Sequence, residues 1–204
     1  MEKLSKLSGR CLPIDSNDVD TDQIIPARHL MRVTRKGLGQ HAFESWSANA
    51  VIKAPERAEA PILLAGANFG CGSSREHAVW ALRDRGIKVV IAESLADIFA
   101  NNCARFGVLA FTLDATVLDG LRKASLADAS FELEVDLPAQ ELRAANGDAW
   151  PFDIDPFVKH CLLEGLDLIG LSLQADSQIT DYESKRPSFR PQTTTPRHIG
   201  NTHV

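Results

Sequence analysis

The sequence predicts an α/β fold whose central sheet is mainly parallel. Short apolar runs alternate with segments of helical period across residues 61–112. Each connection is long enough to hold a helix, which favours parallel strands joined by right-handed crossovers. A chain of 204 residues can bury one sizeable core, or one core and a small subdomain.

The N-terminal part is expected to open with a strand over residues 7–14. An aspartate-rich segment, residues 15–22, follows, and it lacks the glycine and closing glutamate of a calcium loop. Aspartates in such turns usually accept hydrogen bonds from nearby backbone N–H groups. Pro26 disfavours helix at Ile25. Residues 27–60 show no clear period and are expected to form a mobile loop region leading into a short helix, as in lids and binding elements.

The middle of the chain carries the clearest pattern, with strands expected over 61–66, 87–92 and 108–112 and helices over 74–85 and 94–104. The second of these helices has Ser94 and Asp97 at the spacing of a capping pair.

The remaining elements follow from capping residues and alternation. They are a helix over 114–124 capped by Asp114, a strand over 131–136 paired in a hairpin with 140–144, a helix over 156–164 between Asp155 and Gly165, and a helix over 174–185. The tail, residues 190–204, is rich in Pro, Thr and Arg without an apolar period and is expected to be disordered. We therefore expect one domain over residues 1–189.

Composition narrows the function classes. Hydrophobic residues make up 44% of the chain and charged residues 24%, as in ordinary soluble proteins. The net charge of −5 argues against a general nucleic-acid binder. No apolar run approaches the roughly 20 residues that span a bilayer, and no signal-peptide core follows the N-terminus. The chain is therefore expected to be cytoplasmic, with no membrane partner.

The four cysteines, Cys11, Cys71, Cys103 and Cys161, are far apart and form no Cys-x-x-Cys pair. We therefore expect no metal site made by this chain alone, and no disulfide framework in a reducing compartment. Cys71 lies within a glycine turn, where a small buried filler is the simplest interpretation.

Residues 69–77 read Phe-Gly-Cys-Gly-Ser-Ser-Arg-Glu-His and directly follow the strand expected at 61–66. Gly70, Cys71 and Gly72 can turn backbone N–H groups toward an anion, and the dipole of the next helix favours negative charge there. Ser73 would stand where a deprotonating hydroxyl is stabilised. Arg75 can hold a carboxylate through two hydrogen bonds.

A structural alternative exists, because Ser73 and Glu76 also have the spacing of a helix capping box. Nucleotide-binding loops fit less well: the third glycine of the dinucleotide fingerprint, the lysine of the P-loop and the Gly-x-Ser-x-Gly elbow are all missing.

Residues 68–77 resemble the signature of the swivelling domain of the aconitase superfamily. Residues 15–26, Asp-Ser-Asn-Asp-Val-Asp-Thr-Asp-Gln-Ile-Ile-Pro, are similar to the segment that opens that domain, and residues 88–99 give a third match. Chain length and the Arg35-Lys-Gly-Leu-Gly39 segment point to the small subunits of bacterial 3-isopropylmalate dehydratases. The resemblance covers about residues 7–189 and is specific at 15–26 and 68–99. It implies a three-layer β/β/α fold with a smaller antiparallel sheet beside the parallel one.

The resemblance also implies roles. Ser73 would be the base that removes a proton next to a carboxylate, Arg75 would hold a substrate carboxylate, and Ser74 would add a hydrogen bond. Asp22 matches a position near the family's active site. From the local pattern, Glu76 is expected to serve mainly as the helix cap and His77 to be structural. The loop at 28–36 corresponds to the segment that selects the substrate side group, with an apolar set and two arginines as candidates: Leu30, Met31, Val33, Arg32 and Arg35.

The family requires a [4Fe–4S] cluster, for which this chain has no ligand set. The resemblance therefore implies a cluster-bearing large subunit as partner and a small dicarboxylate as substrate. Two alternatives stay open: a related dehydratase acting on homoaconitate, methylmalate or dimethylmalate, and a stand-alone anion-binding module.

Overall fold

The first strand, β1 (Lys6–Pro13), joins the two parts of a seven-stranded sheet. Its first half pairs antiparallel with β5 (Glu132–Asp136), and its end pairs parallel with β2 (Ile62–Ala65). The structure is a computed structural model and describes residues 1–31, 34, 36–46 and 49–187. Across the sheet the strand order is β4-β3-β2-β1-β5-β6-β7.

The parallel part confirms the predicted fold class. It contains β2, β3 (Val89–Ala92) and β4 (Leu109–Thr112), connected by α3 (Glu76–Asp84) and α4 (Asp97–Phe106). Every residue of β2 and β3 is buried, as expected where both faces of a parallel sheet are covered.

The antiparallel part contains β5, β6 (Glu141–Ala144) and β7 (Ala149–Pro151). The β5–β6 hairpin was predicted, whereas β7 was not. Two helices accompany these strands, α5 (Ala115–Ala127) and α6 (Pro156–Glu164). Asp114 and Asp155 accept the first backbone N–H groups of these helices as predicted, and Gly165 ends α6 in a left-handed conformation.

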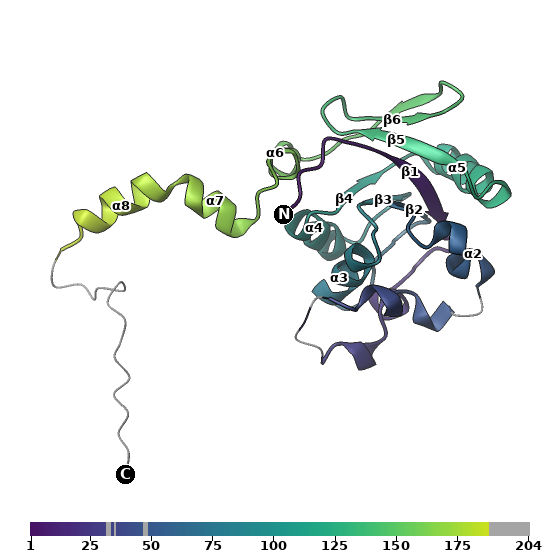
Figure 1. The fold of residues 1–204 in the computed structure, drawn as a ribbon, viewed down its shortest axis with the longest axis horizontal. Helices are drawn as coiled ribbons and strands as arrows, with labels where there is room; N and C mark the ends of the chain where they lie inside the picture. The colour runs from purple at the N-terminus through teal and green to yellow at the C-terminus, as the bar shows by residue number, and fades with distance from the viewer. Residues whose placement is uncertain (32–33, 35, 47–48, 188–204) are drawn as a thin grey trace, which may run out of the picture. The chain divides into compact units, whose positions relative to one another are not determined.

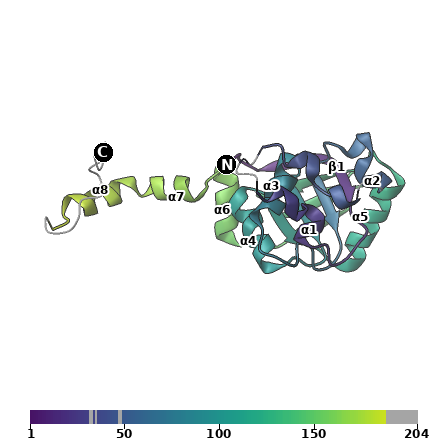
Figure 2. The same cartoon turned by 90° about the horizontal axis from the view of Figure 1, so that it is seen from below.

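Alternate residues of the parallel strands point into two cores. In β2, Leu63 packs with residues of α3 and α4, including Leu82 and Phe99. Its neighbours Ile62 and Leu64 pack on the other face with residues of α5 and of the antiparallel strands. Figure 1 shows the antiparallel strands and the pair α3 and α4 on opposite sides of the parallel strands, and Figure 2 shows α1, α3 and α4 together on one side. This is the predicted three-layer β/β/α arrangement.

The segment between β1 and β2 is built from short helices. They are α1 (Thr21–Ile24), η1 (Ala27–His29), η2 (Gly39–His41), η3 (Glu44–Trp46), α2 (Ala50–Lys53) and η4 (Pro55–Arg57). Three side chains anchor it in the first core, since Leu38, Phe43 and Ile52 are fully buried. The described part of the expected loop region 27–60 therefore packs on the domain.

Two predicted helix starts are wrong. The N-cap of α3 is Arg75, with no side-chain cap, so Ser73 and Glu76 do not form a capping box. The carboxylate of Glu76 instead pairs with Arg105 of α4 at 2.6 Å. Ser94 does not cap α4 either, because its hydroxyl accepts a hydrogen bond from the backbone N–H of Asn68 at 2.7 Å.

The chain divides into two compact units, Met1–Asp167 and Leu168–Val204. In the second unit α8 (Asp176–Ser184) confirms the helix predicted over 174–185, whereas α7 (Leu168–Gln174), which precedes it, was not predicted. The predicted domain end at 189 and the predicted disordered tail 190–204 lie outside the described residues. Within the described ranges, no helix combines the length and apolar character needed to cross a membrane.

Candidate active site

Three loops at the carboxyl ends of β1, β2 and β3 lie side by side. Asp20 bridges to Cys71 and Phe69 bridges to Leu95, both in the parallel direction. The N–H of Gly70 donates to the carbonyl of Val19 at 2.8 Å. These contacts extend the parallel sheet past its strands, to the edge where ligands bind in open α/β sheets.

The two glycines of the turn have separate reasons to be glycine. Gly70 has a φ of +79°, and a Cβ added there would lie 2.2 Å from Cγ of Phe99. Gly72 has a φ of +84° with no such clash. The first glycine therefore allows the turn to lie against α4, and the second reverses the chain direction before Ser73.

A cleft of about 230 Å³ opens beside this turn. Ser73 and Ser74 are exposed at it, and Arg75 is half-buried. The cleft is lined by residues of the glycine turn, the start of α1 and the N-terminal part of α4: Thr21, Gly70, Gly72, Ser73, Ser74, Arg75, Ala96, Asp97, Ile98, Phe99 and Asn102.

The helices that begin at this cleft, α3 and α4, have no side-chain cap at their N-caps, Arg75 and Ala96. By contrast, α1, α2, α5 and α6 all have an Asp or Asn side chain as cap. The first N–H groups of α3 and α4 are thus left for water or a bound anion, and both helix dipoles favour negative charge at the cleft.

Two contacts position the groups predicted to carry chemistry. Nη1 of Arg75 pairs with Oδ1 of Asp22, one residue into α1. The buried hydroxyl of Thr21 donates to the carbonyl oxygen of Ser73 at 3.0 Å. The N-terminus of α1 is in turn fixed by a capping box between Asp20 and Gln23. A rigid helix start therefore holds both Ser73 and Arg75.

The other predicted site residues fall in different places. Asp22 contacts Arg75 rather than lining the cleft. Leu30 is half-buried and Met31 is 93% exposed, and neither lines the cleft. Arg32, Val33 and Arg35 lie outside the described residues.

Cys71 and His77 have surroundings that suit structural roles. Burial, followed by the charges of Asp20 and Asp18, raises the pKa of the Cys71 thiol, so this group stays protonated at neutral pH. The ring of His77 packs against Trp80 at 4.4 Å, one turn along α3.

Sequence reasoning missed Thr21, Asp97 and Asn102 as cleft residues. The carboxyl-end rule for parallel strands could have pointed to Asp97, because it begins the helix after β3. Thr21 and Asn102 carry no comparable local signal.

The described residues include all four cysteines, the usual ligands of an iron–sulfur cluster. Cys11, Cys103 and Cys161 are buried, and Cys71 is half-buried. In this part of the chain, the one group of three or more candidate metal ligands consists of His29, His41 and Glu44, without cysteine. The chain therefore does not offer a cysteine set that fits a cluster.

Comparisons with known proteins agree with this geometry. The family described as the aconitase C-terminal domain matches residues 1–116, and the family LeuD_N matches residues 119–156. The solved structure of 3-isopropylmalate dehydratase (LeuD) from Methanocaldococcus jannaschii superimposes with a TM-score of 0.68 at 29% identity, covering 86% of this chain and 99% of that one.

Curated relatives match over nearly their whole length. The 3-isopropylmalate dehydratase small subunit of Erythrobacter litoralis is 47% identical over 197 residues, which cover 96% of this chain and 97% of that protein. The protein of the same name from Streptomyces griseus is 46% identical over 195 residues, with coverages of 95% and 98%. The chain therefore belongs to the 3-isopropylmalate dehydratase small-subunit family of the aconitase superfamily.

Proposed function

We propose that this chain is the small subunit of a hydro-lyase that converts 2-isopropylmalate to 3-isopropylmalate in leucine biosynthesis, by removing and re-adding water. One observation carries the proposal most directly. Ser73 is exposed at a cleft where two uncapped helices begin and where Arg75 also lies. Family membership supplies the reaction, and this arrangement suits a dicarboxylate substrate.

In this proposal Ser73 is the base that takes the proton from the carbon next to a substrate carboxylate. A serine hydroxyl ionises only where its alkoxide is stabilised. The backbone N–H groups of the glycine turn, the dipoles of α3 and α4 and the charge of Arg75 are available for that purpose. The same proton can return from Ser73 when water adds back.

Arg75 holds a substrate carboxylate in this proposal, and Ser74 adds a hydrogen bond beside it. Asp22 acts as a positioning residue, because its carboxylate fixes the guanidinium of Arg75. The uncapped start of α4 offers further N–H groups to the second carboxylate. Leu30, Met31, Arg32, Val33 and Arg35 remain proposed selectors of the side group.

The partner is a large subunit, as the relatives' designation as small subunits supports. When bound in that subunit, a [4Fe–4S] cluster supplies the Lewis acid that assists loss of the substrate hydroxyl. The cleft beside Ser73 would form this chain's part of the active site and would face the cluster. We also propose that the pair acts in the cytoplasm, as the biosynthetic role of the family suggests.

Reconstitution tests this function. The purified chain is assayed alone and with its large subunit, by following absorbance of the unsaturated intermediate with isopropyl-, methyl- and dimethylmalate and with homoaconitate. We expect turnover only in the pair, with isopropylmalate preferred. Apolar contacts discriminate by about 1–3 kcal/mol per methylene, so the preference should be roughly 10- to 200-fold. Turnover by the chain alone, or a preference for another substrate, would overturn the proposal.

A further inference from the structure

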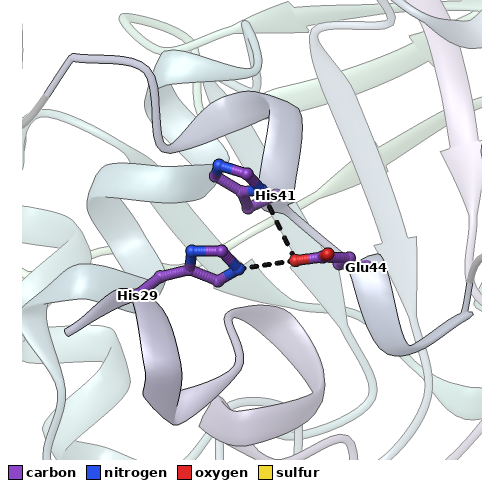
Figure 3. Close-up of side chains that lie close together, drawn as sticks. All are labelled: His29, His41 and Glu44. Carbon is purple, nitrogen blue, oxygen red and sulfur yellow. Dashed lines mark hydrogen bonds and ion pairs between the residues drawn. The ribbon is translucent and has the colours of Figure 1, made fainter.

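A second cluster of chemically active side chains lies outside the cleft. His29 at the end of η1, His41 at the end of η2 and Glu44 at the start of η3 place their ligand atoms within 4.8 Å of one another. Figure 3 shows both imidazoles directed toward the same carboxylate. None of the three residues lines the cleft at Ser73.

We propose that His29, His41 and Glu44 form a binding site for a divalent transition-metal ion of the zinc class. Two imidazoles and one carboxylate make a ligand set that suits zinc and its neighbours, whereas magnesium and calcium prefer oxygen ligands alone. The site is separate from the proposed catalytic function and does not depend on it.

One of the two distances to Oε2 of Glu44 is close to that of a zinc site, and the other would have to widen. Oε2 of Glu44 lies 2.5 Å from Nε2 of His29 and 3.4 Å from Nδ1 of His41. Neighbouring ligand atoms of a tetrahedral zinc site lie about 3.3 Å apart, which follows from bonds of about 2.0–2.1 Å. The two imidazole rings are stacked, with centroids 3.9 Å apart and 18° between their planes, so binding would also turn a ring toward the ion. The ion would replace the hydrogen bond between Nε2 of His29 and Oε2 of Glu44.

The backbone brings these ligands together by a turn that the sequence alone does not reveal. Phe43, between His41 and Glu44, has a φ of +56° although it is not glycine. Its side chain is fully buried, and its N–H donates to the carbonyl of Ile24 at 2.8 Å. Burial therefore holds a conformation that bulky residues rarely adopt, and that conformation places His41 and Glu44 beside His29.

The neighbouring charges are compatible with a metal ion. Arg28 binds the other carboxylate oxygen, Oε1, at 2.9 Å and leaves Oε2 to face the imidazoles. The hydrogen bond from Arg28, followed by that from His29, lowers the pKa of Glu44 to about 2, so the carboxylate is ionised at neutral pH. The Arg28 side chain is 62% exposed, which lets solvent screen its repulsion of a cation.

The expected consequence is a link between η1, η2 and η3. His29 is buried, but Glu44 is 34% exposed, so water can reach the ion as a further ligand. Binding would tie these three short helices together and stabilise the folded chain by mass action.

Metal titration of the full chain tests the proposal. Four proteins are compared: wild type, His29→Gln, Glu44→Gln and the control His160→Gln. The control removes an exposed histidine of α6. Each protein is stripped of metal with a chelator and titrated with zinc chloride in a calorimeter above pH 7. The titration is repeated with all four chains also carrying His198→Gln and His203→Gln, which remove the imidazoles of the tail. We expect one bound equivalent in wild type and control. Binding should be weaker by at least about tenfold in the two cluster variants, because even outer-shell partners contribute about 10–100-fold.

A spectroscopic measurement needs no cluster variant. Cobalt(II) bound at this site should show visible d–d bands without a sulfur charge-transfer band, since cysteine is not among the ligands. Sulfur charge transfer in the wild type, no stoichiometric zinc binding, or unchanged affinity in His29→Gln with native circular dichroism would each overturn the proposal.

Discussion

Replacing Gly70 with alanine tests whether the glycine turn is compressed against α4. The added Cβ would lie 2.2 Å from Cγ and 2.6 Å from Cβ of Phe99. Phe99 is buried, with its ring against Phe69 at 5.3 Å, and the clash is at its stem, so rotation of the ring cannot relieve it. The backbone at φ +79° adds a second cost, because alanine disfavours that region.

Matched variants separate the cost of the clash with Phe99 from the cost of the left-handed backbone. A left-handed alanine costs roughly 1–2 kcal/mol, and overpacking a tight site costs about 1–3 kcal/mol, so Gly70→Ala should lose about 2–5 kcal/mol. Gly147→Ala has a φ of +93° and no neighbour within 4 Å, and should show only the backbone cost. Gly120→Ala, in α5 and equally open, should gain about 0.5–1 kcal/mol.

Thermal unfolding followed by circular dichroism measures all three variants. For a chain of this size about 2–4 °C is expected per kcal/mol, so Gly70→Ala should unfold roughly 4–20 °C below wild type. Gly70→Ala no less stable than Gly147→Ala would refute the claim that the turn lies against Phe99.

Two further variants probe side-chain contacts. Thr21→Val removes the hydroxyl that donates to the Ser73 carbonyl. The free energy of unfolding, measured in urea, should fall by about 1–2 kcal/mol, and the reconstituted pair should turn over more slowly. A variant as stable as wild type would show that this hydrogen bond contributes little to stability. Glu44→Gln tests acid sensitivity. The folded-state pKa of Glu44 is lowered from 4.5 to about 2, so its contribution is present above pH 4.5 and is lost as pH falls toward about 2. Urea unfolding with a chelator present should therefore show a smaller loss over this range in the variant, and parallel losses would contradict the ion pairing.

Helices were predicted correctly where both of their ends are set by residues adjacent in the sequence. Helix α6 begins after Asp155 and ends at Gly165 as expected, because a cap and a left-handed glycine act within one turn. The start of α3 was misjudged because Glu76 pairs with Arg105, 29 residues along the chain. The change of layer along β1 also depends on partners far apart in sequence.

The same distinction holds at the site. Ser73 and Arg75 stand in one glycine turn, so their neighbourhood could be inferred from adjacent residues and the family resemblance. The bond from Thr21 to Ser73 joins residues 52 positions apart, and the pairing of Asp22 with Arg75 spans 53. The cluster of His29, His41 and Glu44 depends on the left-handed turn at Phe43, which the residue type does not suggest.

The most direct measurement is the single-turnover rate of dehydration by the reconstituted pair carrying Ser73→Ala, with substrate affinity and subunit association measured in parallel. Ser8→Ala, an exposed serine of β1, is the control. If Ser73 is the base, the rate should fall by about 100- to 10,000-fold while both affinities hold. A Ser73→Ala pair that dehydrates substrate at the control rate would contradict the account.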